Sequence, residues 1–77
     1  MSQTKVKAPL RILNLALNLL GTRVGLSRED LLRTVAGYPN QEASARRAFE
    51  RDIHHFRRAG LDVEVTNPFE DATYRIR

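Results

Sequence analysis

The sequence contains no cysteine, which excludes disulfide bonds and any zinc site built on thiolates. Its two histidines, His54 and His55, are adjacent, so on a helix their side chains point about 100° apart and cannot bind one metal ion together. The sequence also lacks a glycine-rich phosphate loop and any Ser/His/Asp arrangement. We therefore expect no metal, no cofactor and no enzymatic activity.

Long apolar runs are absent as well. The most apolar stretch, residues 10–20, is interrupted by Arg11, Asn14 and Asn18 and is too short to span a bilayer. No small-residue cleavage site accompanies it. We expect a cytoplasmic protein with no membrane partner.

The length of 77 residues suits one small domain with a thin core. We expect residues 1–8 to form a flexible basic arm and residues 9–77 to fold. Lysine and arginine number 13 against 9 acidic residues, which gives a net charge of +4. In so small a domain this excess favours an anionic partner.

Residues 40–60 form the longest helical pattern in the sequence. On a helical wheel one side is apolar, with Ala45, Ala48, Phe49, Ile53, Phe56 and Ala59. The opposite side carries Arg47, Arg51, His54 and Arg58. Such a helix can anchor in a core and offer cations to phosphates and base edges, or its charged side can simply be solvated.

The neighbouring segments favour the first interpretation. Ser27 is a strong N-cap for a short helix at 28–36, which Gly37-Tyr38-Pro39 ends. After Gly60 the period changes to alternation at 61–66 and 73–77, with a loop between. These signals predict a mainly α protein with a small β-hairpin (α+β), a winged helix-turn-helix of three helices and a two-stranded wing. A very short strand also has room at 24–26.

The helix at about 41–59 would then be the recognition helix in the major groove. Arg47 and Arg51 are the first candidates for base contacts, because they point away from the core in its N-terminal half and arginine binds guanine bidentately. The other candidate DNA contacts are Ser27, Arg28, Tyr38, Arg46, Glu50, His54, Arg58 and Arg75.

Several of these residues have structural alternatives. Arg46 can pair with Glu50 at i+4, Ser27 can act as a cap alone, and Tyr38 can belong to the core. We interpret Asp52 as structural, holding an arginine or a backbone N–H. Acidic residues at 70 and 71 predict that the wing tip stays off the DNA.

The helix at 9–20 is apolar on two nearly opposite sides. One side carries Leu10, Leu13, Leu17 and Leu20, and the other carries Ile12, Leu15, Ala16 and Leu19. A small domain covers one side easily, so we expect Ile12, Leu15 and Leu19 to contact a second subunit, in a homo- or heterodimer, or a downstream domain. The domain could also envelop this helix by itself. An alternative function is therefore protein–protein interaction or dimerisation through the apolar face of this helix.

Four stretches carry a family likeness: RILNLALNLLGTR, LSREDLLRTVAGYP, AFERDIHHFRRAGLDVE and TYRIR. They resemble the N-terminal winged helix of bacterial WYL-domain transcription regulators, most closely the actinobacterial proteasome accessory factor B and C type. The Arg51-Asp52 pair and the Gly37-Tyr38-Pro39 turn are the most specific pieces.

The resemblance implies sequence-specific binding to double-stranded DNA, transcription regulation, a dimeric and nucleoid-associated protein, and a WYL-type domain that this chain lacks. One position departs from the family pattern, because Thr73 stands where glycine often precedes the tyrosine. The operator, the effector, the identity of the partner and the sign of regulation do not follow from the sequence.

Overall fold

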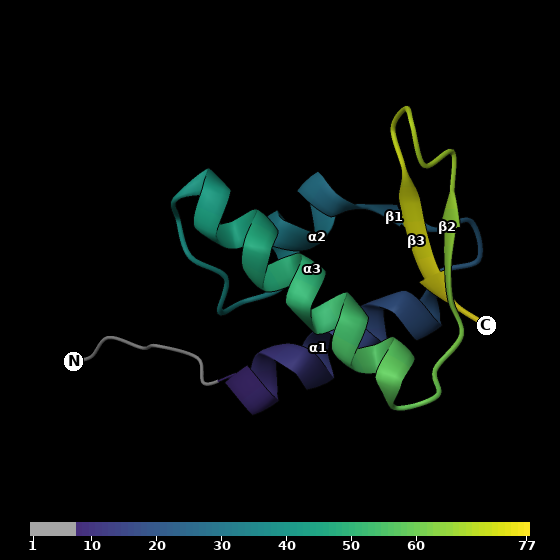
Figure 1. Cartoon of the computed structure of the whole chain (residues 1–77), viewed down its shortest axis with the longest axis horizontal. Helices are drawn as coiled ribbons and strands as arrows, with labels where there is room; N and C mark the ends of the chain where they lie inside the picture. Colours follow the sequence, from purple (N-terminus) through teal and green to yellow (C-terminus); the bar gives the residue numbers. More distant parts are fainter. Residues whose placement is uncertain (1–7) are drawn as a thin grey trace.

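Three helices and a small antiparallel sheet make up residues 8–77, the part of the chain that this computed structural model describes. The elements are α1 (Ala8–Gly21), β1 (Leu26–Ser27), α2 (Arg28–Thr34), α3 (Glu42–Arg58), β2 (Val63–Thr66) and β3 (Thr73–Ile76) (Figure 1). The α+β class is confirmed. Of the predicted basic arm, only Ala8 is among the described residues, and it belongs to α1.

The sheet has the two strands of the predicted hairpin and a third, β1, which shares only Leu26 with the very short strand considered at 24–26; β3 is central. On one side β2 places Val65 opposite Tyr74, and on the other β1 places Leu26 opposite the same tyrosine. Gly25 makes this second pairing possible. Its φ is +95°, and a Cβ there would lie 2.9 Å from the Cβ of Thr73, so only glycine allows the close approach.

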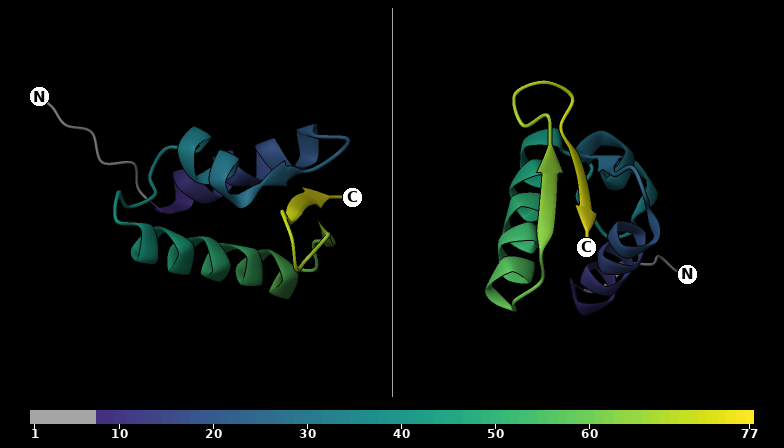
Figure 2. Two further views of the ribbon diagram at one scale, coloured as in Figure 1. Left: turned by 90° about the horizontal axis from the view of Figure 1, so that it is seen from above. Right: turned by 90° about the vertical axis from the view of Figure 1, so that its right-hand side faces the viewer.

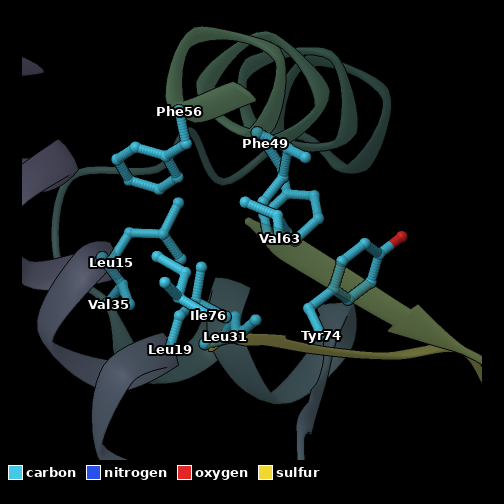
Figure 3. Packing of buried hydrophobic residues seen from close by; sticks show 10 residues of the cluster. Leu15, Leu19, Leu31, Val35, Phe49, Phe56, Val63, Tyr74 and Ile76 are labelled. Atoms are coloured by element: carbon cyan, nitrogen blue, oxygen red, sulfur yellow. The ribbon is translucent and has the colours of Figure 1, made fainter. Parts of the chain in front are cut away.

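The core lies between α3, α1, α2 and the sheet. Phe49 of α3 is fully buried, and its ring meets that of Tyr74 edge to face with 5.0 Å between centroids. Figure 3 shows Phe49 and Phe56 pointing from α3 toward Leu15 of α1 and Ile76 of β3. The predicted apolar side of α3 is therefore its buried side, except that Ala59 follows the last residue of the helix and is exposed.

One carboxylate, Asp52, is buried on the core side of α3. Arg11 of α1 donates to it through Nε and Nη2, each at 2.9 Å, and the Tyr38 hydroxyl donates at 2.7 Å. The Arg11 guanidinium also lies 5.0 Å from the centre of the Tyr38 ring. The interpretation of Asp52 as a structural residue that holds an arginine is confirmed.

This Asp52 network joins α1, α3 and the segment after α2. The hydrogen bond to Asp52 raises the pKa of Arg11, and burial together with the same carboxylate raises the pKa of Tyr38 above its ordinary range. Arg11 therefore stays charged and Tyr38 stays a proton donor. Near the C-terminal end of α3, Arg57 Nη2 donates to the carbonyl oxygen of Val63 at 3.3 Å, which ties the helix to β2.

Candidate nucleic-acid interface

The helix α3 begins at Glu42, close to the predicted start at about 41. Gln41 is the N-cap residue, and its side chain makes no cap hydrogen bond. The Ser44 hydroxyl donates to Gln41 Oε1 at 2.9 Å. The first turn of α3 therefore keeps backbone N–H groups without a side-chain acceptor, and such groups can bind an anion.

The side of α3 away from the core carries four basic side chains, all of them exposed. We call this surface the arginine face, and its residues are Arg47, Arg51, His54 and Arg58. None of the four takes part in an ion pair within residues 8–77. The charges of the three arginines are therefore not cancelled inside this part of the molecule, and the core behind α3 holds all four side chains on one side.

One flank of the arginine face meets α2. Arg28 lies near Glu50 of α3, with 3.9 Å between Nη1 and Oε2, and near Glu29 at 3.4 Å. Its Nε is buried and has no hydrogen-bond partner among residues 8–77. Glu50 thus faces Arg28 and makes no ion pair with Arg46, so the i+4 pair considered from the sequence does not form.

Arg46 lines a shallow cleft of about 320 Å³ between α2 and α3. The cleft residues are Arg28, Glu29, Leu32, Arg33, Tyr38, Pro39, Asn40, Glu42, Ala45 and Arg46. Arg46 is exposed and makes no ion pair within the described part of the chain. It extends the positive surface from the arginine face toward α2.

Two predicted phosphate contacts have other partners. The Ser27 hydroxyl oxygen accepts the Asp30 backbone N–H at 3.1 Å and so caps α2, as its sequence position indicated. The Tyr38 hydroxyl proton is held by Asp52, and its ring packs against the core. Tyr38 therefore has no hydroxyl proton free for a phosphate.

Arg75, the predicted contact from the hairpin, is held within the sheet. Its Nε donates to Glu64 Oε1 and its Nη1 donates to the carbonyl oxygen of Arg23, each at 2.7 Å. Arg77 lies 3.1 Å from the other oxygen of Glu64. These arginines lower the pKa of Glu64, with the Arg75 hydrogen bond contributing most. Arg75 in β3 and Arg77 just after it are thus partly neutralised by one carboxylate.

The hairpin loop, residues 67–72, stands away from the helices in Figure 1. Phe69 in this loop is fully exposed, and Glu70 and Asp71 follow it. The loop is therefore acidic and apolar, and it adds no positive charge to the surface around α3.

The other flank of the arginine face borders a second cleft, of about 480 Å³, between α3 and α1. It is lined by Ala8, Arg11, Ile12, Arg51, Asp52, His54, His55 and Arg58. His55 was not among the predicted contact residues. It follows Arg51 by four residues and precedes Arg58 by three, so helical spacing alone places it beside both, on the side of α3 that faces α1.

The predicted contact face of α1 is wrong for two of its three residues. Leu15 and Leu19 are fully buried, and Ile12 is partly buried against the core. The exposed leucines lie on the opposite side of the helix. Arg11 explains the difference, because its bond to Asp52 turns the neighbouring Leu15 side of α1 inward.

Among residues 8–77 no helix is both long and apolar enough to cross a membrane.

Comparisons of the sequence with protein-family models and with curated proteins found no match. The likeness to WYL-domain regulators therefore depends on the four sequence stretches that carry it.

Proposed function

We propose that this chain is a winged helix-turn-helix domain that binds double-stranded DNA for a bacterial transcription regulator. In this proposal α2 and α3 form the helix-turn-helix, β2 and β3 form the wing, and α3 enters the major groove. The order of elements supports it, because a short capped helix, a turn, a long helix and a hairpin follow one another. The role in transcription comes from the family resemblance.

The observation that carries the proposal is the arginine face. Arg47 and Arg51 are one helical turn apart, exposed, and without an ion-pair partner in residues 8–77. The major groove, about 12 Å wide, accepts an α-helix, and arginine forms two hydrogen bonds with guanine there. In this arrangement Arg47 and Arg51 read base edges.

The flanks of α3 supply contacts to the DNA backbone. Arg28 and Arg46 lie on the α2 side, whereas His54 and Arg58 line the cleft toward α1. A helix lying in the groove has one phosphate strand on each side, so both flanks meet negative charge. Glu50 lies on the α2 flank, near Arg28, and can accept a hydrogen bond from the amino group of cytosine.

The wing contributes little positive charge. Arg75 and Arg77 share Glu64 as a partner, and the loop places Glu70 and Asp71 next to Phe69. Acidic side chains are repelled by phosphates, so the proposed contact with DNA comes chiefly from α3 and the start of α2.

The salt dependence of binding to duplex DNA tests this proposal. With about four phosphates neutralised, log affinity should fall with log salt at a slope of roughly −3.6, which is about a hundredfold between 50 and 200 mM salt. Fluorescence anisotropy of a labelled duplex pool, titrated with the intact chain at several salt concentrations, gives this slope. No binding at about 50 mM salt, or binding that does not change with salt, would count against the proposal.

The alternative function, protein–protein interaction through the helix at 9–20, is favoured by a separate observation. Four leucines of α1 are exposed, although they are not the residues predicted for this contact. Figure 2 shows α3 on one side of the molecule and α1 on another. DNA binding by α3 and protein contact through α1 therefore do not compete for one surface.

A further inference from the structure

The exposed side of α1 is a continuous row of leucines. Leu10, Leu13, Leu17 and Leu20 are 50%, 54%, 58% and 55% exposed. We call this row the leucine face. It lies opposite the buried residues Leu15 and Leu19, so nothing in residues 8–77 covers it. Contiguous apolar surface of this kind marks an interaction site on a small protein.

The spacing of the leucine face suits contact with another helix. The steps between successive leucines are three, four and three residues, which are the a and d positions of a heptad pattern. Side chains at these positions pack into the spaces between side chains of a facing helix. The occupant that fits this face is therefore an apolar helix.

The charge pattern favours a second copy of the same helix. Arg11 is the one charged residue of α1, and it binds Asp52 on the buried side. The residues beside the leucine face are Pro9, Asn14, Ala16 and Gly21, all uncharged. Two copies can therefore meet without bringing like charges together, whereas a charged partner helix would find nothing to pair with.

Two features favour antiparallel pairing. The leucine spacing reads the same in both directions, so a two-fold axis near residue 15 superimposes the face on itself. The first turn of α1 has no acidic residue and the last turn has no basic residue, which leaves both ends of the helix dipole uncompensated. Antiparallel helices place the positive end of one beside the negative end of the other.

We propose that two copies of the chain associate through the leucine face, with their α1 helices antiparallel. Leu10 then lies opposite Leu20 of the second copy, and Leu13 lies opposite Leu17. This pairing leaves the arginine face of each copy exposed, because α3 lies on another side of the molecule (Figure 2). The association does not depend on DNA binding and is testable without DNA.

Sedimentation equilibrium of the intact chain over a range of concentrations tests the association. A contact of two short helices is smaller than a standard interface of about 800 Å² per partner, so we expect a dissociation constant on the order of 10 to 100 μM. The double change Leu13→Glu and Leu17→Glu should weaken it at least about tenfold, because it buries unpaired charges of one sign. Both positions are exposed in the single copy, and circular dichroism checks that the variant still folds.

Val24→Glu is the matched control. Val24 is 85% exposed and apolar, but it lies in the loop after α1 and outside the leucine face. We expect this variant to associate like the unchanged chain. A monomeric unchanged chain at about 1 mM would overturn the proposal. So would a double variant that still dimerises, or a Val24→Glu variant that is equally weakened.

Disulfide cross-linking tests the antiparallel order. The sequence has no cysteine of its own, so only the introduced cysteines can form a disulfide. A mixture of Leu10→Cys and Leu20→Cys chains should form a mixed disulfide dimer on mild oxidation, because these positions face each other. Each variant alone should cross-link poorly. Efficient cross-linking of Leu10→Cys alone, or none in the mixture, would overturn the antiparallel arrangement.

Discussion

Replacement of Asp52 by alanine is expected to lower the free energy of unfolding by about 3–5 kcal/mol. The reason is that Arg11, the partner of Asp52, would be left without its carboxylate. Arg11 keeps its charge, its side chain is only 14% exposed, and both of its hydrogen bonds to the carboxylate are lost. A domain of this size has a total stability of roughly 4–12 kcal/mol, so the loss is a large share of the total. Urea denaturation followed by circular dichroism measures the change.

Two variants separate the ion pair from simple loss of packing. Tyr38→Phe removes one hydrogen bond to the same carboxylate and should cost only about 1–2 kcal/mol. Arg11→Met and Asp52→Leu, combined with Tyr38→Phe so that no hydroxyl loses its acceptor, replace the whole network by apolar groups and should recover most of the stability lost in Asp52→Ala. A cost below about 1 kcal/mol for Asp52→Ala would mean that the network does not hold α1 and α3 together.

The second large effect concerns DNA. Combined replacement of Arg47 and Arg51 by alanine should weaken binding to duplex DNA by about a hundredfold or more, since each arginine contact with a base or phosphate contributes about 1–3 kcal/mol. If both also neutralise phosphates, the salt slope should fall by roughly two. Both side chains are exposed, so the fold should be unaffected. Fluorescence anisotropy at several salt concentrations gives the affinity and the slope together.

Arg23→Ala is the control for net charge. Arg23 is exposed and lies in the loop 22–25, which both views of Figure 2 place away from α3. Only its backbone carbonyl is used, as an acceptor for Arg75, and alanine keeps that group. We expect the affinity to change less than about threefold. Equal losses from Arg23→Ala and from the double variant would point to general charge attraction without a defined DNA-binding face.

The side of α3 that packs in the core could be predicted because a long amphipathic helix repeats its pattern many times. Phe49, Ile53 and Phe56 are buried and Arg47 and Arg51 are exposed, as the 3.6-residue period indicates. Local signals also placed the Ser27 cap correctly. These features depend on residues close together in the sequence, so the sequence alone is enough to predict them.

Features that depend on distant partners were not predictable in the same way. The sequence left room for a very short strand at 24–26, but the two residues of β1, Leu26 and Ser27, are set by pairing with β3, far along the chain. The rotation of α1 depends on Arg11 reaching Asp52, which is 41 residues away. Because both sides of α1 are rich in leucine, periodicity could not decide which side is buried, and the contact residues were assigned to the wrong side.

The candidate DNA contacts also divide into those set by local helical spacing and those set by distant partners. Exposure of the arginine face followed from the helical wheel, but the roles of Tyr38 and Arg75 depended on partners elsewhere. Tyr38 donates its proton to Asp52, and Arg75 binds Glu64 and a loop carbonyl. A type of residue can suggest a phosphate contact, whereas only its neighbours in space decide whether its donors are free.

The most direct test of DNA binding by α3 is a nuclear magnetic resonance titration of the isotope-labelled chain with duplex DNA. We predict that the largest shifts of backbone amide signals fall in the N-terminal half of α3 around Arg47 and Arg51, with smaller shifts at the start of α2 around Arg28. The leucine face of α1 should stay unchanged. Shifts confined to α1 or to the hairpin loop, or no shifts at low salt, would contradict a DNA-binding role for α3.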